Sequence, residues 1–154
     1  MAKIDQKYSN GLTHSNGLTK IPDKLQVPTL RAITAQNSNA YTNTGTRSYL
    51  IGSEQLAIID PGPNITSHFN NIIRAVGNSQ LTHIILTHSH QDHCAMAIRL
   101  AQELKAEICM FGSNDKSNYD LLMSIQDVSA PLKSVEKITE SLTIRKVLDG
   151  DKIF

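Results

Sequence analysis

The sequence has few cysteines, little net charge and no long apolar run. Cys94 and Cys109 are the only cysteines among 154 residues, and both lie in apolar surroundings. This excludes a disulfide-rich secreted fold, and the two thiols are expected to be small buried side chains in a reducing compartment. A disulfide between them is the alternative. A metal-ligand role for Cys94 is also conceivable, although the helix that it begins would point it toward the core.

No stretch of the sequence approaches the length of an apolar membrane-spanning helix. Lys3, Asp5 and Lys7 interrupt any apolar signal region at the N-terminus, so a cytoplasmic location is expected. The formal net charge is +1, and the longest basic run is the pair Arg145-Lys146. The composition therefore shows no basic cluster that would indicate binding to nucleic acid or to a membrane. A folded surface can still assemble a basic patch from distant positions.

The length fits one domain with a sizeable core, preceded by a polar segment. Residues 1–26 lack hydrophobic periodicity, and Ser9–Thr13 recurs as Ser15–Thr19 within them. A single repeat of five residues is too short for a solenoid unit, so residues 1–26 are expected to be a flexible tail. Residues 27–154 are expected to form the domain.

The domain is expected to begin with three short strands. The turn residues Gly52 to Gln55 separate the second from the third, which predicts a hairpin. Asp60 ends the third strand in a Pro-Gly-Pro turn, where neither a helix nor a strand can continue. On its own, this aspartate would be read as a turn former. The three expected strands are Leu30–Ile33, Ser48–Ile51 and Leu56–Ile59.

A helix is expected after this turn, because apolar residues recur there at helical spacing. Asn64 or Thr66 would cap its N-terminus, and Gly77 would end it. His68 falls in the first turn and is expected to be an exposed surface residue. The inner face of the helix comprises Phe69, Ile72, Ile73 and Val76.

Strands and helices then alternate. The apolar run Ile84–Thr87 is typical of a strand buried on both faces, and Glu107–Phe111 is the next expected strand. The helix between them has an inner stripe of Ala97, Ile98, Ala101 and Leu104. This succession predicts a layered α/β fold with right-handed crossovers, a mixed sheet and helices on one face.

The rest of the chain is less regular. A short helix is expected at residues 121–128, inside the obscure stretch 113–140. Leu142–Leu148 resembles a strand, and Asp149–Asp151 is a hairpin-turn signal. Ile153 would begin the returning strand.

Directly after the apolar run Ile84–Thr87 comes the sequence His88-Ser89-His90-Gln91-Asp92-His93, which holds three of the six histidines. Residues two apart on an extended segment point the same way, so His88 and His90 could bind one metal. Asp92 and His93 could bind a second metal or orient the water between the two ions. Imidazole and carboxylate are usual ligands of zinc and of other borderline divalent metals. The alternative is a solvent-exposed, histidine-rich loop without metal.

The pattern His-x-His-x-Asp-His after an apolar strand resembles the metal-binding motif of the metallo-β-lactamase fold. Ala57–Pro63 is similar to the first motif of that family, which implies that Asp60 supports the metal site from behind the ligands. Thr44–Leu50 is similar to the entry strand of one branch, which holds bacterial hydrolases and an animal mitochondrial endoribonuclease. The resemblance implies the N-terminal half of a four-layer αββα sandwich. His83 precedes the apolar run at its other end, so a structural role is expected for it.

The resemblance implies a zinc-dependent hydrolase with two metal ions. Metal-bound hydroxide would attack an ester, thioester, amide or phosphodiester, and Asp92 would be both ligand and catalytic residue. The substrate would be a small molecule or RNA. In the family, a further histidine, a bridging aspartate and a final histidine complete the site, and no histidine follows His93 here.

Each ion would therefore lack one or more of the three protein ligands that a hydrolytic zinc site needs. The chain alone is expected to be poorly active, and a homodimer or a separate C-terminal half could complete the site. The alternative function is a non-catalytic, truncated half-domain that binds metal weakly or needs a partner. A third interpretation, a metal-free acid–base pair of histidines, finds no support in the spacing.

Overall fold

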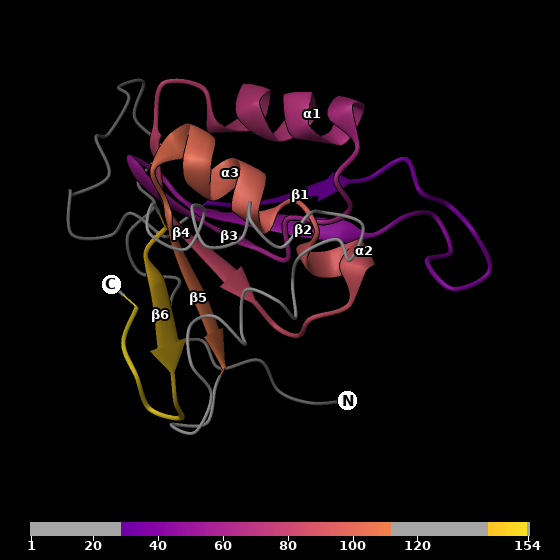
Figure 1. Cartoon of the computed structure of the whole chain (residues 1–154). Helices are drawn as coiled ribbons and strands as arrows, with labels where there is room; N and C mark the ends of the chain where they lie inside the picture. Colours follow the sequence, from indigo (N-terminus) through magenta and orange to yellow (C-terminus); the bar gives the residue numbers. More distant parts are fainter. Residues whose placement is uncertain (1–28, 112–141, 154) are drawn as a thin grey trace, which may run out of the picture.

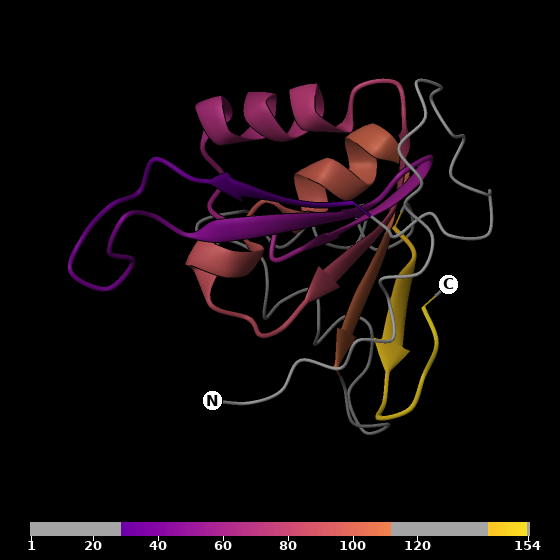
Figure 2. The same cartoon turned by 180° about the vertical axis from the view of Figure 1, so that it is seen from behind.

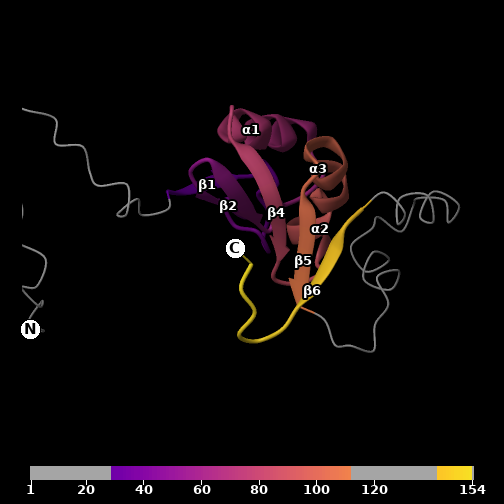
Figure 3. The same cartoon turned by 90° about the vertical axis from the view of Figure 1, so that its left-hand side faces the viewer.

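The computed structural model describes residues 29–111 and 142–153. They form one six-stranded mixed sheet in the order β1-β2-β3-β4-β5-β6, with helices α1 and α3 over the same face (Figure 1). The end-on view in Figure 3 places β1 and β6 at opposite edges of this sheet. The expected α/β class, with a mixed sheet and helices on one face, is confirmed.

The first three strands pair antiparallel. They are β1 (Leu30–Thr34), β2 (Arg47–Gly52) and β3 (Gln55–Ile59). The predicted hairpin is therefore present between β2 and β3. Gly52 is required at its turn, because its φ is 116° and an added Cβ would lie 2.1 Å from the carbonyl oxygen of Gln55.

The other strands pair parallel: β3 with β4 (Gln80–Leu86), β4 with β5 (Glu107–Phe111), and β5 with β6 (Ile144–Val147). Helix α1 (Thr66–Val76) joins β3 to β4, while α2 (Gln91–Cys94) and α3 (Ala97–Leu104) join β4 to β5. The predicted alternation of strands and helices is confirmed. Since parallel strands end at the same edge of the sheet, the residues after β3 and after β4 become neighbours.

Strand β4 begins three residues before His83, earlier than expected, and His83 precedes the apolar run within the strand, as expected. Its Nδ1 is 2.8 Å from Thr82 Oγ1, and its Nε2 is 3.6 Å from Glu107 Oε2. The contact with Glu107 connects β4 to β5, and both contacts agree with the structural role expected for His83.

The core lies between the sheet and the two longer helices. Cys94 and Cys109 are buried and form no disulfide, as expected. On α3 the buried residues are Ala97, Leu100 and Ala101, while Ile98 and Leu104 are only partly buried. The expected stripe was therefore right at Ala97 and Ala101 and omitted Leu100, which lies three residues after Ala97 and so shares its helix face. The largest fully buried apolar side chains are Leu50, Leu56, Ile58, Ile72, Leu81, Ile84, Met96, Leu100 and Ile108.

Two expectations for α1 are wrong. Ile65 occupies the N-cap position in an extended conformation with no side-chain cap, so neither Asn64 nor Thr66 caps the helix. His68 is buried, with 1% of its surface exposed, and not a surface residue. It lies four residues before Ile72 and therefore on the inner face, where Ser48 Oγ lies 3.0 Å from its Nε2. Gly77 ends the helix as expected, with φ of 59°.

The end of the described chain is partly as expected. Leu148 N–H donates to Asp151 Oδ2 at 2.9 Å, so a turn forms there. The expected returning strand is not seen in residues 152–153. The expected tail at residues 1–26 and the expected helix at 121–128 lie outside the described residues. Among the helices that are described, none has the length and apolar character needed to cross a membrane.

Candidate metal centre

Asp60 follows β3 and adopts a left-handed backbone conformation, with φ of 47°. A residue other than glycine in this region is strained by about 1 kcal/mol or more, so the surroundings must hold it there. Its N–H donates to the carbonyl of Ile85 at 2.9 Å. Two residues later, Gly62 N–H donates to the carbonyl of His93, and Met96 N–H donates to the carbonyl of Gly62. Backbone hydrogen bonds therefore attach the Asp60–Gly62 turn to both β4 and the histidine segment.

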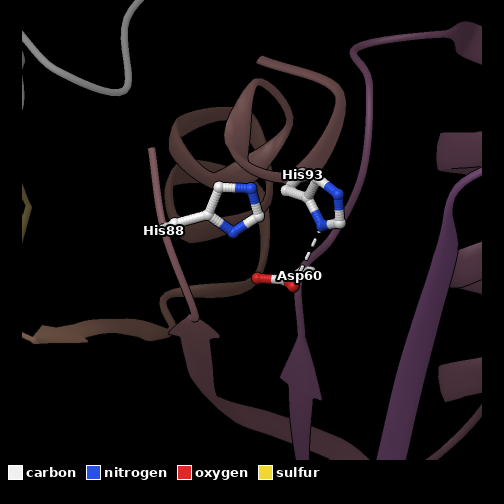
Figure 4. A group of neighbouring side chains, drawn as sticks. All are labelled: Asp60, His88 and His93. Carbon is white, nitrogen blue, oxygen red and sulfur yellow. Dashed lines mark hydrogen bonds and ion pairs between the residues drawn. The ribbon is translucent and has the colours of Figure 1, made fainter. Parts of the chain in front are cut away.

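The Asp60 carboxylate accepts three hydrogen bonds. Thr87 donates two of them, from its N–H to Oδ1 at 2.9 Å and from its hydroxyl to Oδ2 at 2.6 Å. His93 Nδ1 lies 3.0 Å from Oδ2, as the dashed line in Figure 4 marks. His88, His93 and Asp60 form a group whose possible ligand atoms all lie within 4.8 Å of one another. Because Asp60 already binds three donors, we interpret it as the support of the ligands and not as a ligand itself.

His88 and His90 present nitrogen atoms to each other. His88 Nε2 lies 3.1 Å from His90 Nδ1, and the two rings meet edge-on with centroids 4.7 Å apart. Two nitrogens bound to one tetrahedral zinc, each at about 2.0–2.1 Å, are about 3.3 Å apart. The separation between these nitrogens therefore suits a shared divalent metal.

Asp92 and His93 form a second pair of possible ligands. Asp92 Oδ2 lies 3.5 Å from His93 Nε2, and Thr46 Oγ1 donates to the same oxygen at 3.5 Å. The His88 and His93 rings are adjacent, with centroids 4.3 Å apart, so the two pairs are neighbours. The structure thus brings together all four residues predicted as metal ligands, with Asp60 behind them.

Helix α2 is a single turn that contains Asp92 and His93 and places the ring of His93 next to that of His88. His90 is its N-cap, and His93 N–H and Cys94 N–H both donate to the carbonyl of His90. Asp60 is less exposed than Asp92 and His93. Its side chain is 10% exposed, compared with 29% for His93 and 38% for Asp92. The residues predicted as ligands are therefore accessible to solvent, while Asp60 is buried.

The thiol of Cys94 takes no part in this group. It donates to the carbonyl of Ser89 at 3.3 Å. Burial, together with the nearby charges of Asp60 and Asp92, raises its pKa to about 11. Since metals bind the thiolate, this supports the expected role of a buried side chain over that of a ligand.

Three residues at the site were missed in the sequence. Thr87 was assigned to the buried strand alone, although its hydroxyl contacts both Asp60 and His88. Thr46 was read as part of a strand motif, and it is held by Asn37, whose Oδ1 accepts from Thr46 N–H at 2.9 Å and whose Nδ2 donates to Thr46 Oγ1 at 3.0 Å. The loop that carries Asn37 projects beyond the sheet at the end where α2 lies (Figure 2). Gly62 was read only as a turn residue.

The fold and this group of side chains define an α/β protein with a candidate metal centre at the carboxyl ends of β3 and β4. The family model described as the metallo-beta-lactamase superfamily matches residues 41–144. The chain therefore belongs to the metallo-β-lactamase superfamily, as the motif around His88 indicates.

Individual relatives match only in part. A "Beta-lactamase-like protein 2 homolog" from Caenorhabditis elegans is 29% identical over 97 residues, which is 60% of this chain and 31% of the relative. An "Atrochrysone carboxyl ACP thioesterase dmxR1" from Cryptosporiopsis is 39% identical over 70 residues, which is 43% of this chain and 21% of the relative. The chain thus spans less than a third of the length of these curated relatives.

A solved structure shows the same fold. The metallo-β-lactamase from Staphylococcus aureus subsp. aureus COL superposes with a TM-score of 0.50 at 19% sequence identity, covering 83% of this chain and 32% of that one. At this identity, the likeness concerns the fold alone.

Proposed function

We propose that this chain carries part of the active site of a zinc-dependent hydrolase, with His88, His90, Asp92 and His93 as the metal ligands. The observation that carries this proposal is the spacing of two adjacent ligand pairs, with 3.1 Å between His88 Nε2 and His90 Nδ1 and 3.5 Å between Asp92 Oδ2 and His93 Nε2. Three imidazoles and a carboxylate form a nitrogen and oxygen donor set that zinc and other borderline divalent ions prefer. The family is one of metal-dependent enzymes, which supports the same assignment.

Bound zinc would make water a nucleophile near neutral pH and would stabilise negative charge on the oxygen of the substrate. The residues of the chain would bind the ions, orient the attacking water and keep the ligands in position. His88 and His90 would hold one ion, and Asp92 and His93 the other. Asp92 would also be the catalytic residue that orients the attacking water, because its carboxylate is 38% exposed and Thr46 holds one of its oxygens. Asp60 would keep His93 in place by accepting its Nδ1 hydrogen.

For the substrate, we propose a small molecule with an ester, thioester or amide bond, and the phosphodiester of RNA as the alternative. The thioesterase among the relatives supports a thioester. The longest basic run, Arg145-Lys146, offers little attraction to a polyanion. We also propose that the chain functions in the cytoplasm, since its two cysteines form no disulfide.

We further propose that the site needs ligands from elsewhere. The four proposed ligands give each ion two protein donors from residues 29–111 and 142–153, one fewer than the three that hydrolytic zinc sites use. The remaining donors would come from outside these residues, from a separately made second half or from a second copy of the chain. The chain alone would then bind zinc weakly and be poorly active.

A non-catalytic role is the second candidate, and the same two-donor count favours it. Such a half-domain would bind one ion weakly or only support a partner. Zinc titration by calorimetry separates the two functions by the number of ions bound: two ions, even if bound weakly, indicate the catalytic site, whereas one ion or none indicates the non-catalytic form.

The catalytic proposal is tested by hydrolysis of an acyl thioester, an aryl ester and a short RNA, each with added zinc and with a chelator. We expect slow turnover that requires zinc and is abolished by H88Q or D92N. The variant H83Q, outside the site, is the matched control and should keep the activity. Turnover that persists in the chelator, or that survives H88Q, would contradict the proposal.

A further inference from the structure

Thr87 lies between Asp60 and His88 and contacts both through its hydroxyl. Its Oγ1 lies 2.6 Å from Asp60 Oδ2 and 2.8 Å from His88 Nδ1. The same oxygen of Asp60 lies 3.0 Å from His93 Nδ1. A continuous series of contacts therefore runs from His88 through Thr87 and Asp60 to His93, and it joins one residue from each proposed metal pair.

The direction of every hydrogen bond in this series follows from the number of hydrogens available. A carboxylate only accepts, so the Thr87 hydroxyl donates its single hydrogen to Asp60. The hydroxyl oxygen must then accept from His88, which requires a hydrogen on His88 Nδ1. His93 must likewise carry its hydrogen on Nδ1 in order to donate to Asp60. In the neutral imidazole, this leaves Nε2 of each ring as the nitrogen with a lone pair.

We propose that Thr87 is a positioning residue that extends the influence of Asp60 from His93 to His88, so that one buried carboxylate sets the tautomer of a histidine in each metal pair. This inference rests on the proposed function, because it concerns how the same site is prepared for metal. It adds a hydroxyl that acts only through His88 and does not itself touch the metal.

His90 is expected to behave differently from the other two histidines. With Nε2 of His88 left as an acceptor, the 3.1 Å contact requires that His90 donate its Nδ1 hydrogen to it in the metal-free protein. Nδ1 of His90 is also the nitrogen that faces the shared metal position. Zinc binding must therefore move the hydrogen of His90 from Nδ1 to Nε2, while His88 and His93 keep theirs on Nδ1.

The test is a nitrogen-detected NMR spectrum of the imidazole rings in the full chain, with ¹⁵N-labelled histidine, recorded at about pH 8 so that free imidazoles are neutral. In the metal-free wild type we expect the Nδ1–H form for His88, His90 and His93. On addition of zinc, only His90 should change to the Nε2–H form. A wild-type spectrum in which His88 carries its hydrogen on Nε2 would overturn the proposal without any variant.

The matched variants are T87V and T87S. Valine keeps the shape and the backbone N–H that donates to Asp60 Oδ1, but it lacks the hydroxyl, whereas serine restores it. We expect His88 to lose its preference for Nδ1–H in T87V and to regain it in T87S, with His93 unchanged in both as the internal control. A residue with a merely structural role would lower stability without moving the tautomer of His88, and an unchanged His88 in folded T87V would overturn the proposal.

Zinc affinity provides the second measurement. Loss of a hydrogen bond behind a ligand typically lowers metal affinity about 10–100-fold, so T87V should bind zinc correspondingly less tightly than T87S and the wild type. If the wild type binds no zinc at all, the proposed function fails, while the tautomers of the metal-free protein still decide the role of Thr87. The two failures are thus distinguishable.

Discussion

Asp60 is far less exposed than His93 and Asp92, and it contacts His93 directly and His88 through Thr87. Its carboxylate accepts from Thr87 and His93 at 2.6–3.0 Å, in a turn whose left-handed conformation its neighbours maintain. Replacing a buried acceptor that holds three donors costs more free energy than replacing an exposed acceptor, because each buried donor is left without a partner. Under the proposed function, the metal affinity of the site would therefore depend on a residue that does not itself bind the metal.

The substitution D60N tests this dependence. An asparagine keeps the size of the side chain, but it replaces one acceptor oxygen with a donating amide opposite the donors of Thr87 and His93. We expect zinc affinity to fall about 10–100-fold, measured by competition with a chromophoric chelator. D149N, a change of the same type at an exposed residue, is the control and should leave the affinity unchanged. Equal zinc affinity in D60N and the wild type would show that Asp60 does not orient the ligands.

His68 makes stability depend on pH. Burial lowers its pKa in the folded protein below the ordinary value of 6.5, and a backbone hydrogen bond at Pro61 opposes this only in part. The unfolded chain therefore binds the proton more tightly, so the contribution of His68 to stability is present above about pH 6.5 and is lost as the pH falls below it. We expect urea unfolding midpoints of H68Q to decline less than those of the wild type between about pH 7 and pH 5.

H83Q is the control for this measurement, since it keeps His68 and should retain the decline that His68 causes. An identical pH dependence in H68Q and the wild type would mean that His68 is protonated as easily in the folded chain as in the unfolded one.

Three elements surround the site: the end of β4, the Asp60–Gly62 turn and the single turn of α2. Backbone hydrogen bonds join them. Gly62, in the turn after β3, forms backbone hydrogen bonds with His93 in α2 and with Met96, the residue before α3. The buried ring of His68 on α1 supports the same turn from below, close to Gly62. The positions of the proposed ligands thus depend on packing between α1, the turn and α2 as well as on the motif itself.

Gly62 leaves no room for a side chain in this packing. Its φ is 88°, and an added Cβ would lie 2.8 Å from His68 Nε2. Gly150 has nearly the same φ, 85°, but nothing lies within 4 Å of an added Cβ. We expect G150A to lower the free energy of unfolding by about 1–2 kcal/mol through backbone strain alone, and G62A to lower it by at least 1 kcal/mol more. Chemical denaturation measures both. If the two variants lose the same stability, the contact between His68 and Gly62 is not restrictive.

The sequence predicts the elements well and the side-chain contacts between them poorly. The strands, both main helices and the parallel arrangement follow from runs of apolar residues and from turn residues, which act locally. His68 was misplaced because a histidine in the first turn of a helix gives no sign of the serine that faces it across twenty residues. Thr87 was missed for the same reason: its partner Asp60 follows a different strand, and only the pairing of β3 with β4 brings the two residues together.

At the scale of the whole molecule, the topology of the sheet creates the site. Asp60 and Thr87 are 27 positions apart, yet both follow strands that run parallel, with Ile59 paired to Ile85 just before them. The carboxyl ends of adjacent parallel strands share one edge, which is where ligands bind in such sheets. A metal bound there would link side chains within the His88–His93 segment to one another. Hydrogen bonds of Asp60 and Thr87 already attach that segment to the ends of β3 and β4.

Zinc should therefore stabilise the entire described fold and not just the loop that holds it. Binding to the folded chain alone adds about 2.7 kcal/mol to the free energy of unfolding when free zinc is about 100 times its dissociation constant. We expect a zinc-dependent rise in the thermal midpoint that follows this dependence on concentration, that a chelator reverses, and that H90Q reduces by removing one donor of the first pair. H83Q should keep the full rise, because His83 lies in the middle of β4, where it contacts Thr82 and Glu107. A midpoint that is insensitive to zinc, or an equal rise in H90Q and the wild type, would exclude the pair His88 and His90 as a metal site.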